Sequence, residues 1–466
     1  MKNDWDTSVF DVAVIGAGVV GCAVARRFVL EGARVLVLEK GADLLSGASK
    51  ANSAILHTGF DAPPGSLEVA CMQAGYEEYL SIARLMNLSV LETGAIVAAW
   101  RAEEAGKLDA IEAQARQNGV HDVRRVTRDE ILAREPHLHP SVIEGLLIPR
   151  EHVIDPWSAP LGYLTQAVQN GAHVVFHAEV HRATRDRDGW QIDSARGAFR
   201  ARFVINCAGL FGDRIERIFL GAASFEIRPR KGQFVVFDKS AANLIRTTIL
   251  PVPTERTKGV VVVRTVFGNV LVGPTAEEQD DRAHATVDET TLHALVRKAA
   301  ELVPALADVP VNAVYAGLRP ATEQKDYRVH LDAERGYIAL GGIRSTGLTA
   351  ALGLAQHALK LYASAGRSHT PLPEVLYPRM PNLCEHRERD WERPGDNEIV
   401  CHCERVTRRE IEAALTSAIP AGDFGGLRRR TRVCMGRCQG FYCSARVAEL
   451  TAGKLDVPLA VGVSHE

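Results

Sequence analysis

Five cysteines gather near the end of the 466-residue chain, in a pattern that suits metal or redox chemistry. Cys401 and Cys403 form a C-x-C pair, and Cys434, Cys438 and Cys443 follow within the stretch CMGRCQGFYC. The other four of the nine cysteines are scattered along the chain. In a large protein of a reducing compartment, clustered thiols favour a metal or redox site over disulfides.

The spacing of these thiols leaves three interpretations open. A structural zinc site usually takes C-x2-C pairs, which the C-x-C and C-x4-C spacings match poorly. Disulfides or inert thiols are the second interpretation, and a cytosolic chain disfavours them. An iron–sulfur cluster held by four thiolates is the third. Only the third would also let the chain pass electrons one at a time to a partner.

The other end of the chain carries a dinucleotide-binding pattern. The apolar run FDVAVI predicts a strand, GAGVVG follows it, and helical sequence comes next. In this pattern Gly16 permits a tight turn, Gly18 lets the backbone approach a pyrophosphate, and Gly21 lets helix and strand pack closely. A second predicted strand ends at Glu39, whose carboxylate would accept hydrogen bonds from a ribose hydroxyl. Together these parts indicate FAD or NAD rather than a set of plain turns.

The remaining elements favour FAD. No second strand–GxGxxG–helix unit is found that would hold a nicotinamide nucleotide. The segment 203–209 (FVINCAG) predicts a buried strand with a small-residue turn, and 336–359 predicts a strand, a glycine-rich turn and an apolar helix. Backbone N–H groups at such a helix start suit a phosphate or an electron-rich ring edge.

Length and composition indicate a globular protein of two or three domains. With 46% hydrophobic residues, 24% charged residues and a net charge of −2, the chain has no signature of nucleic-acid binding or disorder. Its longest uncharged apolar run, residues 12–25, is too short to span a bilayer and follows acidic residues, unlike a signal peptide. We expect a cytoplasmic protein without a transmembrane segment, with peripheral contact at the inner face of the membrane left open.

Two further segments have a clear composition. Residues 226–275 contain short β-branched runs divided by Gly and Pro, which predict antiparallel strands, and 280–307 predicts a helix. Residues 366–397 are rich in proline and charge, which is typical of a linker, and they end where the cysteines begin.

Four stretches together resemble a known family. The glycine cradle, GASKANSAILHTGF (47–60), VINCAG and GGIRSTGLTAA are similar to the FAD-dependent amine and hydroxy-acid oxidoreductases. That group includes glycerol-3-phosphate dehydrogenases, L-2-hydroxyglutarate oxidases and D-amino-acid oxidases. The resemblance covers about the first 370 residues. It is strongest to the large subunit of anaerobic glycerol-3-phosphate dehydrogenase, because of how the chain ends.

The resemblance implies an α/β fold with three parts. A Rossmann-like FAD domain would carry an inserted antiparallel-sheet substrate domain, and a small helical iron–sulfur domain would follow. The expected boundaries are 1–85, 146–225 and 315–366 for the FAD domain, 86–145 and 226–314 for the substrate domain, 367–397 for the linker, and 398–466 for the [2Fe–2S] domain.

An FAD site is implied by the same resemblance. It would combine the glycine cradle with groups from later segments. The implied FAD-binding residues are Gly16, Gly18, Gly21, Glu39, Lys40, Ser49, Asn52, Ser53, Val180, Ala208, Gly209, Gly342, Gly347, Leu348 and Thr349.

At the substrate end, oxidation by flavin needs a base and an anchor for the substrate's anionic group. The resemblance implies His57 as the base, since its segment passes beside the flavin ring in the family; a structural histidine is the alternative. Arg319 matches an arginine that clamps the substrate's carboxylate or phosphate, with an ordinary ion pair as the alternative. Lys231 and Arg344 are further anchors, and Tyr327 is a weaker choice.

The turn at Arg344 departs from the best-known pattern. Well-characterised glycerol-3-phosphate dehydrogenases resemble GGK followed by a threonine- and tyrosine-rich stretch, whereas GGIRSTGLT is closer to hydroxy-acid oxidases. The sequence therefore predicts a small anionic hydroxy substrate of the glycerol 3-phosphate type. An L-2-hydroxy acid or an amino acid is the alternative.

The cysteine region resembles the [2Fe–2S] domain of bacterioferritin-associated ferredoxin. In that domain the pattern is C-x-C, a basic RTR stretch, and C-x4-C within GMGRCQG. Carried over, it implies the cluster ligands Cys401, Cys403, Cys438 and Cys443, and leaves Cys434 as a bystander or a rival ligand. The arginine run 428–432 is either a solvated face or a group that balances the cluster or docks a redox partner.

These expectations describe an FAD-dependent dehydrogenase that transfers hydride from a small anionic substrate to flavin. Its electrons would leave through the [2Fe–2S] cluster to a partner subunit or a quinone, and no nucleic-acid partner is expected. A subunit that only relays electrons within a larger flavin and iron–sulfur complex is the alternative.

Overall fold

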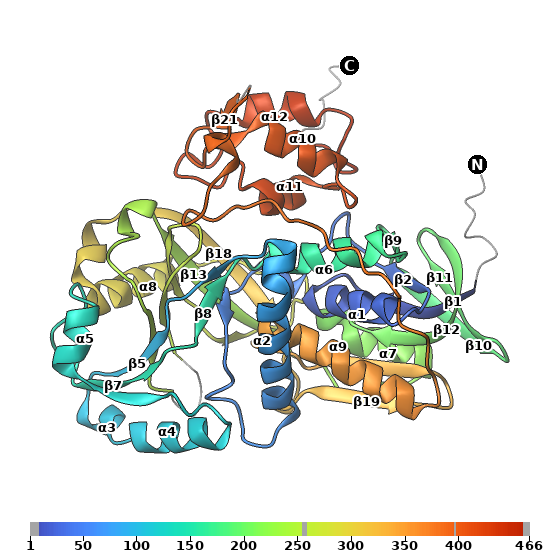
Figure 1. Ribbon diagram of the computed structural model, residues 1–466, viewed down its shortest axis with the longest axis horizontal. Helices are drawn as coiled ribbons and strands as arrows, with labels where there is room; N and C mark the ends of the chain where they lie inside the picture. The colour runs from blue at the N-terminus through green and yellow to red at the C-terminus, as the bar shows by residue number, and fades with distance from the viewer. Residues whose placement is uncertain (1–8, 254–258, 396–397, 460–466) are drawn as a thin grey trace.

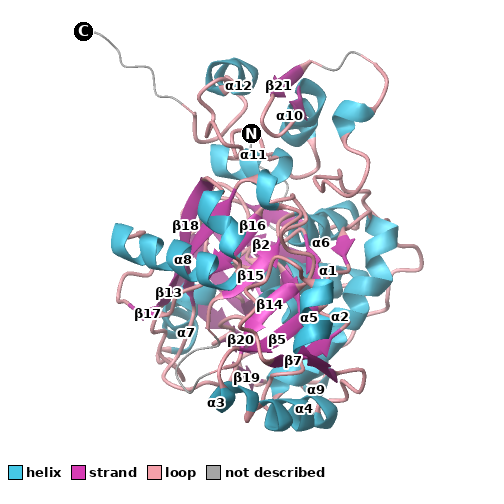
Figure 2. Ribbon diagram, turned by 90° about the vertical axis from the view of Figure 1, so that its left-hand side faces the viewer, coloured by secondary structure: helices cyan, strands magenta, loops and turns pink. Residues whose placement is uncertain are grey.

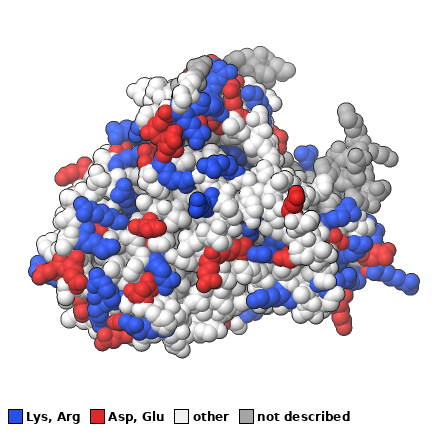
Figure 3. All heavy atoms as spheres, viewed as in Figure 1, with Lys and Arg blue, Asp and Glu red and all other residues white. Residues whose placement is uncertain are grey.

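The computed structural model describes residues 9–253, 259–395 and 398–459. Two large sheets lie side by side, each with its own helices, and a small helical domain stands above them at the carboxyl end of the chain (Figure 1). Lys, Arg, Asp and Glu side chains are intermixed over the face drawn in Figure 3. Among the helices of the described residues, none is both long and apolar enough to cross a bilayer.

The first sheet has eight strands and a parallel centre, as the dinucleotide-binding pattern predicts. The predicted strand, helix and strand at the start of the chain are all present. The central strands are, in spatial order, β9 (His173–Val175), β2 (Val35–Leu38), β1 (Val9–Ile15), β12 (Gly197–Asn206) and β20 (Tyr337–Gly341). The antiparallel strands of its outer part are β10 (Val180–Asp186), β11 (Gly189–Ser194) and β19 (Arg328–Asp332).

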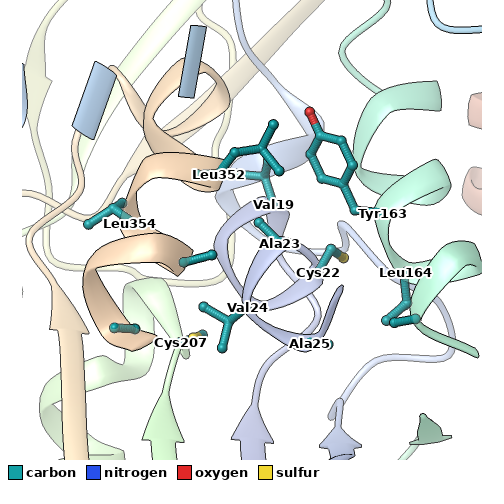
Figure 4. Packing of buried hydrophobic residues seen from close by; sticks show 14 of the residues in the cluster. Val19, Cys22, Ala23, Val24, Ala25, Tyr163, Leu164, Cys207, Leu352 and Leu354 are labelled. Atoms are coloured by element: carbon teal, nitrogen blue, oxygen red, sulfur yellow. The ribbon is translucent and has the colours of Figure 1, made fainter. Parts of the chain in front are cut away.

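Helices cover both faces of this sheet. Figure 4 shows the apolar packing of the first helix against its neighbours. These helices are α1 (Val19–Leu30), α2 (Leu67–Met86), α6 (Ser158–Gln169), α7 (Gly212–Leu220) and α9 (Gly347–Ser364). Helices α2 and α9, which carry Gly75 and Gly353, pack closely. A Cβ at either glycine would lie about 2.1 Å from a backbone oxygen of the other helix.

The second sheet has nine strands, and the predicted antiparallel pairing is confirmed for every neighbouring pair except one parallel pair, β14 with β5. Its strands are β5 (Ala95–Ala99), β6 (Arg124–Thr127), β7 (Glu144–Ile148), β13 (Arg230–Phe237), β14 (Thr248–Pro251), β15 (Val261–Arg264), β16 (Val270–Gly273), β17 (Glu277–Glu278) and β18 (Val311–Arg319). Its helices are α3 (Ala102–Ala105), α4 (Leu108–Gln117), α5 (Arg128–Arg134) and α8 (Glu289–Leu302).

The helix predicted over 280–307 is shorter in the structure. Helix α8 begins at Glu289 because the Asp288 side chain accepts a hydrogen bond from the Thr291 amide and caps it. Residues 304–308 form a separate short 3-10 turn.

A small three-stranded sheet joins the two large ones. It pairs β3 (Ile55–Leu56) with β8 (His152–Ile154), and β8 with β4 (Val90–Leu91). Strands β3 and β8 are antiparallel, with Leu56 opposite His152.

The carboxyl-terminal domain has its own apolar core and a two-stranded sheet. Helix α10 begins at a capping box. The Thr407 side chain accepts a hydrogen bond from the Glu410 amide and the Glu410 side chain accepts one from the Thr407 amide, which is typical of the T-x-x-E spacing of these two residues. Figure 2 shows α11 at the base of this domain, next to the upper end of β18. The elements are β21 (Ile399–Cys401), β22 (Val406–Thr407), α10 (Arg408–Thr416), α11 (Phe424–Thr431) and α12 (Ser444–Thr451).

Candidate active site and cluster site

The glycine cradle has the geometry that a pyrophosphate needs. Gly16 has φ of +102°, which disfavours any residue with a side chain. A Cβ at Gly21 would lie 1.9 Å from the Gly16 carbonyl oxygen, so only glycine lets α1 approach β1 this closely. Gly18 is the N-cap of α1, where backbone N–H groups point outward. The start of α1 is therefore suited to bind a phosphate group.

Glu39 follows β2 and is buried beside the cradle. Its carboxylate accepts hydrogen bonds from the amides of Ala17 at 2.7 Å and Gly41 at 2.8 Å. Burial raises the pKa of Glu39, and these two amides oppose that shift. A carboxylate accepts about four hydrogen bonds, so Glu39 retains capacity for a ribose hydroxyl while it also shapes the loop.

Most of the other implied FAD residues lie at the carboxyl ends of the parallel strands or at the start of α9. This edge is where open α/β sheets bind their ligands. Ser49 accepts a hydrogen bond from the Val19 amide at 3.0 Å, and a Cβ on Gly347 would lie 3.9 Å from Val19. Lys40 lies 3.3 Å above the Phe211 ring. The remaining positions are Asn52 and Ser53 before β3, Val180 at the start of β10, Ala208 and Gly209 after β12, Gly342 after β20, and Leu348 and Thr349 in the first turn of α9.

His57 and a buried carboxylate form a pair at the end of β3. His57 Nδ1 lies 2.7 Å from Glu151 Oε2, and Glu151 Oε1 accepts hydrogen bonds from the Thr58 amide and hydroxyl. The Glu151 side chain is fully buried. A buried carboxylate at Nδ1 assigns the proton to that nitrogen and leaves Nε2 as the basic one. The arrangement can therefore orient a histidine for proton abstraction.

Sequence reasoning did not single out Glu151, the partner of His57. It is 94 positions from His57, and nothing in the stretch PREHVIDP marks it as a partner. The antiparallel pairing of β3 and β8 brings them together. Leu56 lies opposite His152, so His57, which follows Leu56, lies beside Glu151, which precedes His152.

Arg319, at the end of β18, is largely buried and turned towards carbonyl groups. Its guanidinium donates to the Thr275 carbonyl at 3.1 Å and to the Lys231 carbonyl at 3.5 Å. Within the described ranges no carboxylate lies within ion-pair distance of it. Burial, together with the nearby charges of Arg230 and Arg344, lowers the pKa of Arg319 to about 10. A buried cation without a carboxylate is suited to bind an anionic substrate group.

Strand β18 also places Arg319 next to residues 47–60, the flavin segment, which the family resemblance puts beside the flavin. A Cβ on Gly317 would lie 2.6 Å from the Ala51 side chain, and the Tyr315 hydroxyl donates to the Asn52 carbonyl at 2.9 Å. The strand therefore lies against the segment 47–60 that also carries His57. The implied base and the implied anchor stand on two pieces of chain in direct contact.

The two secondary anchors are placed differently. Lys231 Nζ lies 2.9 Å from a Glu277 carboxylate oxygen, so its charge has a protein partner. The Arg344 guanidinium donates to the Lys325 carbonyl at 2.7 Å and is partly exposed. The Tyr327 hydroxyl lies 2.6 Å from the Thr346 hydroxyl, and burial raises the pKa of this tyrosine.

The space that Arg319 occupies depends on a glycine. A Cβ on Gly232 would lie 2.6 Å from Arg319 Nη2. We expect Gly232→Ala to displace the guanidinium and to raise the KM for an anionic substrate about tenfold, which corresponds to about 1.4 kcal/mol of binding free energy. Steady-state kinetics check this. Gly268→Ala, in a turn of the same sheet, is the control, and an equal rise in its KM would contradict the interpretation.

The five clustered thiols meet where the loops 401–405 and 434–443 come together. Cys403 and Cys438 are close enough for each thiol to shift the pKa of the other, and the same holds for Cys401 and Cys443. Across the described parts of the chain, no three His, Cys, Asp or Glu side chains surround a single metal-ion position. Two pairs of thiols are nevertheless what a two-iron cluster with four cysteine ligands requires.

Cys434 belongs to the same group of thiols. Its Sγ lies 3.4 Å from Cys443 Sγ. Its φ is +59°, in the left-handed region that favours glycine. Cys434 is therefore close enough to compete as a ligand, and its backbone is in a conformation that a cysteine rarely adopts.

The arginine run 428–432 is not a solvated face. The Arg430 guanidinium forms two hydrogen bonds of 2.7 and 2.8 Å with the buried Asp43 carboxylate of the flavin domain. The Arg432 guanidinium lies 2.8 Å from Glu404, which follows Cys403, and 4.0 Å above the Phe267 ring. The solvated-face interpretation is wrong because these arginines hold the carboxyl-terminal domain against the rest of the protein.

A line of contacts runs from the flavin segment to the cysteine domain. The Trp157 indole donates to the Lys50 carbonyl at 3.1 Å and stacks on Phe267, with ring centroids 5.3 Å apart. Arg432 also lies over the Phe267 ring and is two residues from Cys434. The two cofactor regions are thus joined by packed side chains and not only by the linker.

The Asp43–Arg430 pair gives a direct test of this docking. Both side chains are buried, so Asp43→Ala would leave the arginine charge uncompensated, which typically costs about 3–5 kcal/mol. We expect easier proteolysis of the linker and a lower unfolding temperature. The control is Asp456→Ala, whose contact with His177 is exposed and is worth about 0–1 kcal/mol. Equal proteolysis of the two variants would contradict the role of the buried pair.

Comparisons with known proteins match two parts of the chain to two families. Residues 11–361 match the family described as FAD dependent oxidoreductase, and residues 399–452 match the BFD-like [2Fe-2S] binding domain. The second match rules out the zinc and disulfide interpretations of the cysteines.

Curated relatives include glycerol 3-phosphate dehydrogenase of Caloramator mitchellensis, 31% identical over 98% of this chain and 97% of that protein. Glycerol 3-phosphate oxidase of Mycoplasma pneumoniae is 29% identical over 75% of this chain and 94% of its own length. L-2-hydroxyglutarate dehydrogenase of Caenorhabditis elegans is 27% identical over 59% of this chain and 65% of its own length.

A solved structure with the same fold is the L-alpha-glycerophosphate oxidase of Mycoplasma pneumoniae with FAD bound. It aligns with a TM-score of 0.73 and 26% identity over 79% of this chain and 98% of its own. The expected family, fold class and cofactors are thereby confirmed. The chain belongs to the FAD dependent oxidoreductase family and is an FAD-dependent dehydrogenase whose carboxyl-terminal [2Fe–2S] domain relays electrons.

Proposed function

We propose that the protein oxidises glycerol 3-phosphate or a closely similar small anionic alcohol. The observation that carries the proposal is the Arg319 guanidinium, buried without a carboxylate on a strand that lies against the flavin segment. Such a group binds a phosphate or carboxylate, and the relative that spans nearly the whole chain is a glycerol 3-phosphate dehydrogenase.

In the proposed mechanism the chain's own residues bind, orient and deprotonate. Bound FAD supplies a hydride acceptor, and the [2Fe–2S] cluster supplies a one-electron acceptor. Arg319 holds the substrate's anionic group, and His57 accepts the hydroxyl proton at Nε2. Glu151 keeps the other ring nitrogen protonated and stabilises the histidine when it becomes charged. Arg344 adds positive charge near the anchor, while Lys231, paired with Glu277, contributes the backbone carbonyl that Arg319 contacts.

The proposed FAD site is the cradle of Gly16, Gly18 and Gly21 with Glu39 and the strand-end residues named above. The proposed cluster ligands are Cys401, Cys403, Cys438 and Cys443, and the expected domain boundaries stand as part of this proposal. Electrons would leave the cluster for a partner subunit or a quinone. A cytoplasmic location, with peripheral contact at the membrane, fits the same scheme.

An L-2-hydroxy acid is the second candidate substrate. It is supported by the L-2-hydroxyglutarate dehydrogenase relatives and by the turn GGIRSTGLT at Arg344. A carboxylate and a phosphate use the same bidentate contact with arginine, so Arg319 suits either. A subunit that only relays electrons would have no need for the buried arginine.

The test is anaerobic bleaching of the flavin absorbance by a panel of polyol phosphates, 2-hydroxy acids and amino acids. We expect glycerol 3-phosphate to bleach wild-type flavin fastest. Arg319→Gln should raise the required concentration 10- to 100-fold, about 1.4–2.8 kcal/mol of lost binding. If no compound bleaches the flavin, the dehydrogenase assignment fails; if only a 2-hydroxy acid does, the substrate assignment changes.

A further inference from the structure

Two adjacent aromatic side chains project from the cysteine domain. Phe441 and Tyr442 are 82% and 80% exposed, more than any other large hydrophobic residue in the described part of the chain. Their rings meet edge to face with centroids 5.2 Å apart. Both lie in the loop between Cys438 and Cys443, two of the proposed cluster ligands. Exposed aromatic surface beside a redox centre is a feature of interaction sites.

Two exposed arginines lie within two residues of the proposed cluster ligands Cys403 and Cys438. The Arg437 and Arg405 side chains are 69% and 48% exposed, whereas the carboxylates that contact them, Asp238 and Glu385, are 6% and 27% exposed. The outward charge of the patch is therefore cationic. Within the loops 401–405 and 434–445 the one acidic residue is Glu404, which is 1% exposed.

The opposite side of the domain is already occupied. Helix α11 faces the two large sheets in Figure 1, and its arginines bind the flavin domain through Asp43. On the loop itself, Gln439 donates to the Asn312 carbonyl at 2.9 Å, which fixes the loop against β18. The aromatic pair is thus carried on a loop anchored from behind, with its rings facing solvent.

We propose that Phe441, Tyr442, Arg405 and Arg437 form the docking surface for an electron-carrier protein with an acidic, partly apolar face. The cationic rim selects and orients the carrier, and the two rings supply the apolar contact. In the complex one electron passes from the reduced cluster to the oxidised centre of the carrier. The cluster is oxidised by one electron, the carrier is reduced by one, and no bond or proton is transferred.

A carrier protein fits this surface better than a membrane does. Two aromatic side chains bury little apolar area compared with an amphipathic helix, and stable membrane attachment requires more. A surface placed on the ligand-bearing loop brings a protein redox centre close to the cluster. The inference rests on the proposed exit of electrons through the cluster.

The test uses the holoenzyme and an acidic plant-type ferredoxin as the probe. One double variant is Phe441→Ser with Tyr442→Ser, and the other is Arg405→Gln with Arg437→Gln. The matched control is Leu376→Ser with Tyr377→Ser, which removes exposed apolar side chains from the linker. Calorimetry measures ferredoxin affinity at two salt concentrations, and stopped-flow absorbance measures the rate of electron transfer between the cluster and ferredoxin.

We expect wild-type affinity to fall with salt, and each loop variant to bind at least tenfold more weakly and exchange electrons correspondingly more slowly. The control should match wild type. Absence of ferredoxin binding, or equal binding by all variants, would overturn the proposal. Anionic phospholipid vesicles test the membrane alternative. The proposal would also be overturned if wild type bound these vesicles and the loop variants lost that binding while their ferredoxin binding was unchanged.

Failure of the proposed function gives a different result. Substrate bleaching of the flavin and the visible spectrum of the cluster are recorded for every variant. Wild-type flavin that no substrate bleaches would refute the dehydrogenase proposal, while ferredoxin binding would still report on the docking surface.

Discussion

His57→Ala should lower kcat by a factor on the order of 10² to 10⁴, the usual contribution of a general base. The physical reason is the pair with Glu151, which holds the ring with Nδ1 protonated and Nε2 basic. Rapid-reaction measurement of flavin reduction isolates this step from later electron transfer. The KM should change little, because Arg319 and not His57 is proposed to bind the anionic group.

Glu151→Gln separates orientation from simple packing. The amide keeps the size of the carboxylate and can still accept from the Thr58 amide, but its NH2 would then face His57 Nδ1. The ring would take the other tautomer, with Nε2 protonated and unable to accept a proton. We expect flavin reduction to slow by at least tenfold, with its pH profile displaced.

Glu151→Asp is the conservative control, since it retains the charge. Partial recovery of the rate in that variant is expected if the carboxylate positions the histidine. Equal rates for Glu151→Gln and wild type would show that His57 does not act as the base in this orientation.

Cys438→Ser should remove the [2Fe–2S] cluster, because a hydroxyl is a poor substitute for a thiolate ligand. The expected result is loss of acid-labile sulfide and of the cluster's visible absorbance, with FAD content unchanged. Electron transfer to an external acceptor protein should fall by orders of magnitude, whereas substrate bleaching of the flavin should persist. Iron and sulfide analysis with an absorbance spectrum provides the measurement.

Cys434→Gly is the matched variant in the same loop. Glycine adopts φ of +59° without strain, so this change should keep the cluster and leave the protein equally or slightly more stable, by about 1 kcal/mol. The comparison decides which thiols are ligands. Cluster loss in Cys434→Gly, with retention in Cys438→Ser, would exchange the two cysteines in the ligand set.

The flavin domain and the cluster domain are coupled through specific side-chain contacts. The Asp43–Arg430 pair and the line Lys50, Trp157, Phe267 and Arg432 join them at positions far apart in sequence. A fixed separation favours rapid electron transfer between the cofactors. The expected acceptor would then meet the cluster from its solvent side, at Phe441 and Tyr442.

The sequence by itself determined the local features. Strand β1, the glycines at 16, 18 and 21 and helix α1 are specified by neighbours in the chain, because turn conformation, helix start and close packing depend on residue types a few positions apart. The capping box at Thr407 and the cysteine spacing were recognisable for the same reason. The family, the two cofactors and the antiparallel second sheet followed from such local patterns.

Only the tertiary structure decided the long-range pairs. Glu151 beside His57 depends on the register of β3 and β8, and the burial of Arg319 depends on β13, β18 and the flavin segment meeting. The arginine run 428–432 has the composition of a solvated face, yet Arg430 is buried because Asp43 lies opposite it. One chain gives no signal for such partners, since hydrogen bonds and ion pairs form between positions that the fold brings together and composition does not mark.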